Sequence, residues 1–160
     1  MYSVIDIARY IINYAYDNDI VIHYLKLQKI LYFVQLQFLL SNHNNPCFKE
    51  NIYSRNVVII YIPEVNKEFH HYGLHWIPRI KEYYDISDGL WNIKKVKYVT
   101  KISPTHQKII NSVVNECDKY GNIELGNIIT KQSPYIESLK KSNRIISVNS
   151  LIWFINQCIK

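Results

Sequence analysis

The stretch LKLQKILYFVQLQFLL, residues 25 to 40, decides the fold. Its apolar residues recur at helical spacing in one stripe made of Leu27, Ile30, Leu31, Val34 and Phe38. The stripe is widened almost to a full circle by Leu25, Phe33, Leu36 and Leu40. A helix that is apolar on nearly every side has to be covered by the rest of the chain. We therefore predict a central helix over about residues 23–40, with the remainder of the protein packed around it.

The same stretch differs from a membrane helix. It is shorter than the roughly 20 apolar residues that cross a bilayer, and it is interrupted by Lys26, Gln28, Lys29, Gln35 and Gln37. The N-terminal segment MYSVIDIARYIINYAYDND has no basic region and no small-residue cleavage site, so it is typical of a first folded helix. We expect no membrane contact.

Composition and cysteine usage indicate one cytoplasmic domain over residues 1–160. The chain is 48% apolar, which suffices for a core, and its four glycines and five prolines argue against disorder and against a loop-rich all-β fold. The three cysteines include no CxxC pair, and an odd number suits a reducing compartment. We expect the cytoplasm of a bacterial host.

Capping and spacing signals predict further helices on both sides of a weaker middle section. Ser3 starts a helix that runs to about residue 15. The later helices are expected to start at Pro63, Pro104, Glu124, Pro134 and Ser147 or Asn149. Between these, residues 57–62 (VVIIYI) indicate a buried strand, and residues 76–78 and 96–99 indicate short extended segments. The predicted fold is mainly α, a compact helical domain with a small β element inserted at about residues 50–100.

Few residues suggest catalysis, and we predict neither a cofactor nor a catalytic site. His70, His71 and His75 form the one histidine cluster, and His71 and His75 are four apart like zinc ligands on a helix. Gly73 interrupts that helix and no cysteine is near, so we interpret them as surface histidines, with a metal-dependent enzyme as the alternative. Glu64 and Glu68 are one turn apart, and a solvated helix face accounts for this acid pair.

A basic, aromatic stretch lies at the end of this middle section. It comprises Trp91, Lys94, Lys95, Lys97, Tyr98 and Lys101, in a chain of net charge +6. Such a mixture can bind single-stranded nucleic acid or a guide RNA, and it is also typical of an edge strand protected by lysines. Both interpretations stay open at this point.

The order of motifs along the chain carries a family resemblance. IARYIINYA (residues 7–15) precedes LKLQKILYF (25–33), and PEVNKEFHHYG (63–73), TKQSPYIESLKK (130–141) and SLIWFI (150–155) follow. This order resembles the Panacea domain family, which includes SocA-like and phage-associated GepA-type proteins. The positions that carry the family motif include Leu25, Lys26, Leu27, Gln28, Lys29, Leu31, Tyr32, Phe33, Pro63, Thr130, Pro134 and Tyr135.

The chain also departs from the family pattern. Panacea domains usually carry Trp-x-x-Gly-Pro just before Pro-Glu-Val, where this chain has NVVIIYI at residues 56–62. Lys131 and Tyr135 stand where the family has His and Trp. The resemblance implies a retained helical scaffold and an altered partner surface.

The resemblance implies a protein-binding antitoxin or inhibitor without catalysis. Its partner would be a toxin, or a host defence nuclease blocked in the manner of an anti-CRISPR protein. A nucleic-acid-binding regulator is the second alternative. The candidate binding surface lies between residues 56 and 91 and comprises Tyr61, Glu64, Glu68, Tyr72, Trp76, Tyr83, Tyr84 and Trp91.

Overall fold

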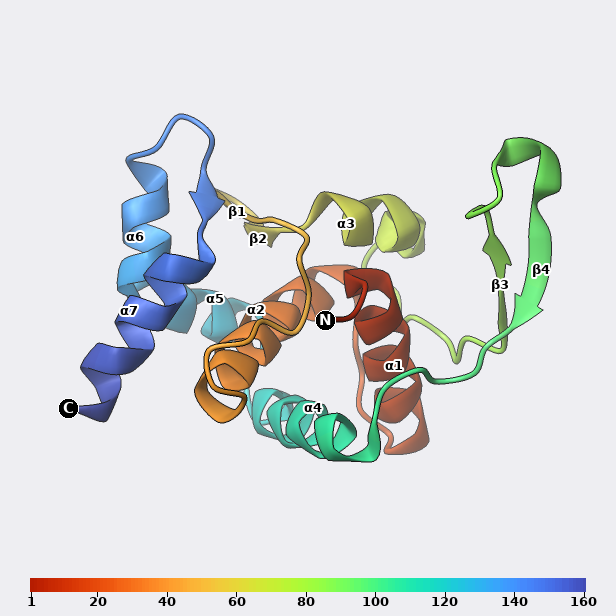
Figure 1. Cartoon of the computed structure of the whole chain (residues 1–160), viewed down its shortest axis with the longest axis horizontal. Coiled ribbons are helices and arrows are strands. Elements are labelled where there is room, and N and C mark those ends of the chain that lie inside the picture. The colour runs from red at the N-terminus through yellow and green to blue at the C-terminus, as the bar shows by residue number, and fades with distance from the viewer.

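The computed structural model describes residues 1–160 and contains seven α-helices and two small antiparallel sheets (Figure 1). The helices are α1 (Val4–Asp17), α2 (Tyr24–Ser41), α3 (Pro63–Phe69), α4 (Pro104–Asp118), α5 (Asn122–Thr130), α6 (Ser133–Leu139) and α7 (Val148–Ile159). This confirms the predicted mainly α fold with a small β element in the middle of the chain. No helix combines the length and the apolar character needed to cross a bilayer.

Helix α2 lies at the centre of the molecule, as its sequence predicts. It contacts α1, α3, α4, α5, α7 and strand β2. His23 caps its N-terminus, where the imidazole Nδ1 accepts a hydrogen bond from the Lys26 backbone N–H. Leu27, Leu31 and Phe38 are fully buried. These helices therefore bury α2 on most of its circumference.

The prediction that α2 is covered on every side was wrong for one sector. Leu40 is 49% exposed, and Phe33 and Leu36 are half-buried. The three side chains line an apolar groove of about 740 Å³, together with Phe154 and Ile159 of α7. The groove exists because α4 and α7 flank the C-terminal half of α2 from two sides and leave this sector open between them.

The glutamines that interrupt the apolar pattern of α2 bind loop segments. Gln35 is buried, and its Oε1 accepts a hydrogen bond from the Cys47 backbone N–H at 2.8 Å while its Nε2 donates to the Phe48 carbonyl at 2.9 Å. The Oε1 of Gln28 accepts from the Ile62 N–H at 2.7 Å. Each bond satisfies a backbone group that would cost free energy if buried alone.

The lysines of α2 have the same role toward neighbouring segments. Lys26 Nζ donates to the Tyr120 carbonyl at 2.8 Å. Lys29 is buried, and its Nζ donates to the Val58 carbonyl at 3.1 Å and to Asn122 Oδ1 at 2.8 Å. Burial lowers the pKa of Lys29 to about 8. The polar residues of α2 thus hold the segments around it in place.

The first sheet joins the middle of the chain to its C-terminal part. Its strands are β1 (Ile52–Arg55), β2 (Ile59–Tyr61) and β5 (Ile145–Ile146), in the order β2-β1-β5. Ile52 pairs with Ile146. The sequence correctly indicated a strand within residues 57–62, but only residues 59–61 form it. The turn that joins β1 to β2 occupies residues 56–58 and leaves Val57 91% exposed.

The second sheet is a two-stranded hairpin formed by β3 (Glu82–Asp85) and β4 (Lys94–Lys97). We call residues 82–97 the β-arm, because the hairpin extends away from the helices on the side of α1 (Figure 1). The extended segment predicted at residues 76–78 belongs to no strand, and the strand predicted at 96–99 begins and ends two residues earlier. The strand ends at Lys97 because this residue pairs with Glu82, the first residue of β3.

Candidate functional site

The tip of the β-arm exposes apolar side chains. It contains the short 3₁₀ helix η2 (Leu90–Asn92), where Trp91 is 98% exposed and Leu90 is 75% exposed. Ile86 and Ile93 are also exposed beside them. We call Ile86, Leu90, Trp91 and Ile93 the tip patch. A two-stranded hairpin has no core of its own, so the tip patch has no residues to pack against. An exposed apolar patch of this kind marks a surface that another protein can cover.

The register of the β-arm assigns its tyrosines to opposite faces. Tyr83 lies opposite Val96, and Tyr84 lies opposite Lys95. Because successive residues of a strand point to opposite faces, only one of the two tyrosines faces α1. Tyr83 is half-buried there, and Tyr84 is exposed. Of the two, Tyr84 is therefore the one available to a partner.

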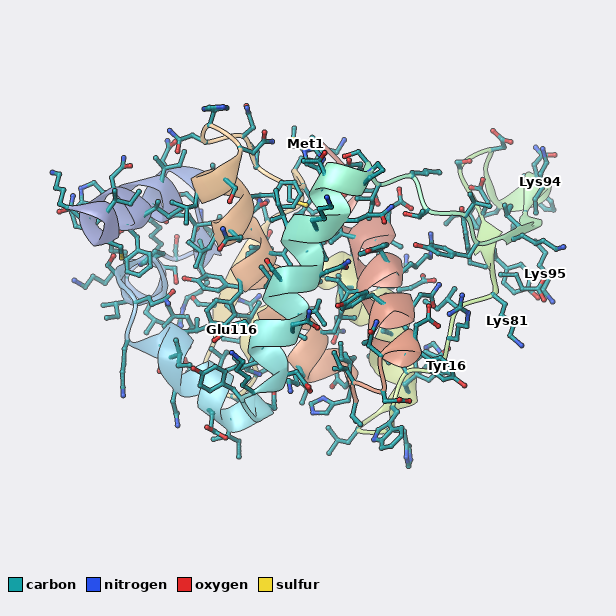
Figure 2. All side chains as sticks on the ribbon, turned by 90° about the horizontal axis from the view of Figure 1, so that it is seen from below. Met1, Tyr16, Lys81, Lys94, Lys95 and Glu116 are labelled. Carbon is teal, nitrogen blue, oxygen red and sulfur yellow. The ribbon has the colours of Figure 1, made fainter.

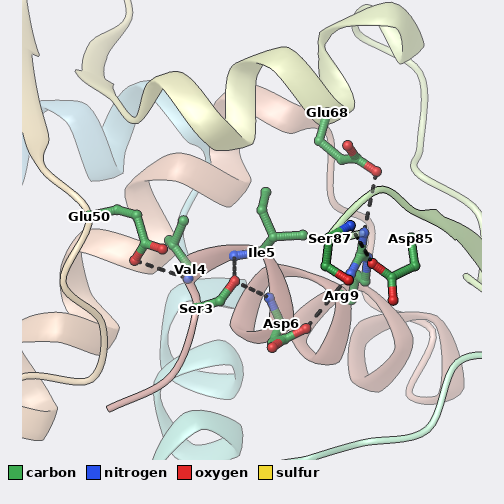
Figure 3. A network of polar contacts seen from close by, with 9 residues as sticks. All are labelled: Ser3, Val4, Ile5, Asp6, Arg9, Glu50, Glu68, Asp85 and Ser87. Atoms are coloured by element: carbon green, nitrogen blue, oxygen red, sulfur yellow. Dashed lines mark hydrogen bonds and ion pairs between the residues drawn. The ribbon is translucent and has the colours of Figure 1, made fainter. Parts of the chain in front are cut away.

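Arg9 of α1 fixes the inner face of the β-arm. Its guanidinium carbon lies 3.7 Å from the centroid of the Tyr83 ring. The same buried guanidinium pairs with Asp6 at 3.7 Å and with Glu68 of α3 at 3.5 Å (Figure 3). One arginine thus joins α1, α3 and the β-arm through a stacked aromatic ring and two carboxylates.

The base of the β-arm is fixed by hydrogen bonds to α1 and to the segment after it. The side-chain amide of Asn13 donates to the Ile80 carbonyl at 3.0 Å and accepts from the Ile80 N–H at 2.7 Å. The Ile77 N–H donates to the Ile22 carbonyl at 3.0 Å, and Arg79 pairs with Asp17. The arm is therefore anchored at its base, whereas the side chains of the tip patch are exposed.

Arg9→Met should loosen the β-arm while the helices stay folded. Methionine keeps most of the packing but removes the ion pairs and the stacking on Tyr83. We expect the interaction that holds the arm on α1 to weaken by about 1.4 kcal/mol, which makes the detached arm about tenfold more populated. Limited trypsin digestion measures this as faster cleavage after Lys94 and Lys95, because cleavage tracks local opening. The control is Lys119→Gln, which removes an exposed charge far from the arm. An unchanged cleavage rate in Arg9→Met would show that Arg9 does not hold the arm.

Charges on the β-arm are balanced, because its three acids, Glu82, Asp85 and Asp88, are matched by three lysines, Lys94, Lys95 and Lys97. Lys94 pairs with Asp88 at 3.6 Å and Lys95 with Glu82 at 3.4 Å, both on the surface. The lysines of this region without an ion pair are Lys81, Lys97 and Lys101, which lie at the base of the arm. Figure 2 shows Lys81, Lys94 and Lys95 pointing outward from the arm. The unpaired positive charge therefore lies at the base of the arm, where it suits acidic residues on a partner surface, and the charges nearer the apolar tip are balanced.

The structure distributes the residues of the predicted binding surface over several places. Tyr83, Tyr84 and Trp91 belong to the β-arm, and the exposed Trp76 lies in the segment that leads to it. Tyr72 is half-buried in the 3₁₀ helix η1 (His70–Tyr72).

The remaining members of the predicted surface lie elsewhere. Glu64 and Glu68 are exposed on α3, where Glu68 pairs with Arg9 and not with Glu64. Tyr61 is half-buried in β2, beside Arg55. The predicted surface is thus not one continuous patch.

The histidine cluster lies at the end of α3. His70 Nδ1 is 2.8 Å from the Asn66 carbonyl oxygen, and the His71 ring packs on Tyr72 at 4.1 Å between centroids. Gly73, with φ of +58°, ends the helical segment before His75. No group of three or more His, Cys, Asp or Glu side chains is arranged to hold a metal ion.

The residues that match the family motif lie mainly in the scaffold. Leu27, Leu31 and Tyr32 are fully buried in α2, while Leu25 and Phe33 are half-buried. The Tyr32 hydroxyl donates to Gln132 Oε1 at 2.6 Å, and burial raises the pKa of Tyr32. These positions hold the helices together.

The later motif positions continue the scaffold. Pro63 starts α3 and Thr130 ends α5. Pro134 and Tyr135 are buried in α6, and the Tyr135 hydroxyl donates to the Arg55 carbonyl at 2.9 Å. This bond ties α6 to strand β1.

Sequence reasoning missed several residues of the candidate surface. Ile86, Leu90 and Ile93 flank Asp88-Gly89, a dipeptide typical of turns. Apolar residues on both sides of a turn signal would have indicated an exposed apolar tip. Arg9 carried no such signal, because its contacts come from segments far away in the chain.

Comparison of the chain with protein-family models, with curated proteins and with solved structures finds no match. The structure defines the class of the protein, a mainly α domain with a projecting β-arm. The resemblance to Panacea domains stays a prediction from the sequence motifs.

Proposed function

We propose that this protein is a non-catalytic inhibitor of the antitoxin type, which binds a protein partner through the tip of the β-arm. The observation that carries the proposal is the tip patch, in which Trp91 is 98% exposed next to Leu90. Tryptophan is among the residues that contribute most to protein–protein binding when a partner covers them. A rigid base that presents such a residue lowers the entropy cost of binding.

The chemistry of the partner follows from the surface of the β-arm. The tip patch requires an apolar pocket, and the unpaired lysines at the base of the arm, Lys81, Lys97 and Lys101, suit acidic residues beside that pocket. A stable complex of ordinary size buries about 800 Å² on each partner, which exceeds what the tip patch alone provides. The exposed Tyr84 and Trp76 extend the contact area toward the base of the arm.

Two partners fit this chemistry. One is a toxin encoded beside this gene, as the Panacea resemblance implies, and the other is a host defence nuclease whose activity a mobile element blocks. The identity of the neighbouring reading frame separates them. Nucleic acid is less favoured, because Glu82, Asp85 and Asp88 lie among the lysines of the arm and repel phosphates.

Co-purification tests the proposal. The tagged chain is co-expressed with the product of the neighbouring gene, and we expect a stable complex that also restores growth if that product is toxic. The double variant Leu90→Ser/Trp91→Ala should weaken the complex by about 2 kcal/mol or more, roughly 30-fold. Titration of the purified partner measures this change in Kd.

The matched control is Trp153→Ala, which removes another exposed tryptophan, from α7 at the opposite end of the molecule. It should leave the Kd unchanged. Equal affinity of the tip double variant and the wild-type protein would refute binding through the tip. Gel retardation whose affinity falls steeply with salt, in the absence of a protein partner, would favour the nucleic-acid regulator instead.

A further inference from the structure

A second cavity lies at the turn between β1 and β2, away from the β-arm. It has a volume of about 360 Å³ and lies between Gln28 of α2, Asn66 of α3 and the turn at residues 56–58. Arg55 and Tyr61 complete its lining. We call it the turn cavity. Four of its seven lining residues are polar or charged, whereas 12 of the 16 residues that line the groove beside α2 are hydrophobic.

Gln28 brings an unused hydrogen-bond donor to the turn cavity. The side chain is completely buried, and its Nε2 has no hydrogen-bond partner in the protein. The orientation of the amide is fixed, because Oε1 accepts the Ile62 N–H at 2.7 Å and the reverse orientation would place two donors face to face. Buried donors are nearly always paired. An acceptor that enters the cavity would satisfy this one.

Arg55 brings a positive charge without a counter-ion. Its guanidinium donates to the Ser54 carbonyl at 2.9 Å and lies 5.1 Å from the centroid of the Tyr61 ring. None of the ion pairs of the molecule involves Arg55. The remaining N–H groups of the guanidinium are therefore free for a ligand, and the ring beside them limits its movement.

Other groups around the turn reinforce the positive potential. Arg144 Nη1 donates to Asn56 Oδ1 at 3.4 Å, and Lys29 Nζ donates to the Val58 carbonyl. Neither has a carboxylate partner. The side-chain amide of Asn66 makes no hydrogen bond within the protein, which leaves a further donor on the wall of the cavity.

We propose that the turn cavity binds a carboxylate group, which accepts hydrogen bonds from the Gln28 amide and pairs with Arg55. The planar carboxylate matches the fork of N–H groups on a guanidinium. A phosphate carries more charge and would need further cations directed into the cavity, whereas Lys29 is turned to Val58 and Asn122. The site does not depend on the β-arm or on the function proposed for it.

The carboxylate has two possible sources, the C-terminus of a peptide chain or a small carboxylic acid. The purified protein is therefore titrated separately with acetyl-Gly-Ala, with the carboxamide of the same dipeptide, with acetate and with phosphate. The signal is the Gln28 side-chain NH₂ pair in a ¹H–¹⁵N NMR spectrum. We expect a saturable shift with acetyl-Gly-Ala and none with its carboxamide or with phosphate. Acetate binding about tenfold or more weaker assigns the site to a chain terminus, and comparable acetate binding assigns it to a small acid.

Variants test the roles of the residues. Arg55→Gln removes the charge at a half-buried position and should weaken carboxylate binding about tenfold or more. The control, Lys49→Gln, removes an exposed charge outside the cavity and should leave binding within about twofold. Any of three results overturns the proposal: no saturable shift up to roughly 100 mM acid, equal binding of the carboxamide, or unchanged binding in Arg55→Gln.

Discussion

Leu31→Asp should unfold the protein. Leu31 is fully buried at the centre of α2, and α2 contacts most of the other helices. The substitution removes a core side chain, which costs about 2–5 kcal/mol, and it adds the cost of burying a carboxyl group without a partner. A total of about 5 kcal/mol or more equals or exceeds the stability of many domains. Circular dichroism and a thermal melt measure the loss of helix and of the cooperative transition.

The matched control places the same residue on the same helix. Leu40→Asp lies at the open sector of α2, where the side chain is 49% exposed, so its new carboxylate stays in water. We expect a loss of about 1 kcal/mol and a retained fold. A cooperative transition close to the wild-type Tm in Leu31→Asp would show that α2 is not the centre of the core.

Stability should rise with pH between 8 and 10.5 through Lys29. The ordinary pKa of a lysine is 10.5, and burial lowers the pKa of Lys29 to about 8 in the folded protein. Below pH 8 the ammonium is protonated in both states, and its burial is a fixed cost. Between the two pKa values the unfolded chain holds more protons, so raising the pH favours the folded state. The full gain is about 3 kcal/mol.

Comparison with Lys29→Met isolates this contribution. The free energy of unfolding is measured by urea titration at several pH values for both proteins. Burial also raises the pKa of Tyr32, and that of Cys117 to about 12. Both groups lower the stability at high pH. Their contribution is the same in the wild-type protein and in Lys29→Met, so it cancels when one free energy of unfolding is subtracted from the other. The free energy of unfolding of the wild-type protein should rise relative to that of Lys29→Met as the pH increases. The control Lys108→Met changes an exposed lysine, so its free energy of unfolding should follow the same pH dependence as that of the wild-type protein. If the difference in free energy between the wild-type protein and Lys29→Met did not change with pH, the lowered pKa of Lys29 would be contradicted.

The helical part of the fold could be predicted because its signals are local. The apolar stripe of α2, the Pro63 start of α3 and the Ser103-Pro104 start of α4 each act within one or two turns of the chain. Gln28 and Lys29 could also be identified in the sequence, but only as polar residues that interrupt the apolar pattern of α2. Their burial depends on acceptors and donors from residues 58–62 and 122, which no local pattern reveals.

The sheet and the candidate sites depend on distant pairings. Strand β5 has only two residues and is defined by its pairing with β1, not by its own composition. The turn cavity requires α2, α3 and the β1–β2 turn to meet. The exposed aromatics of the β-arm could be suspected from Trp91 and Tyr84, but which tyrosine faces α1 follows from the hairpin register.

The pairing of β1 with β5 sets the order in which the chain can complete its fold on the ribosome. Ile146 follows Ile52 by 94 positions, and synthesis at about 5–20 residues per second makes the two strands available roughly 5 to 20 seconds apart. Until then one edge of β1 is unpaired, and open edges recruit other strands. A nascent chain therefore passes through an interval in which this edge can pair with other chains. A chain truncated before residue 145 would keep that edge open and exposed to pairing with other strands.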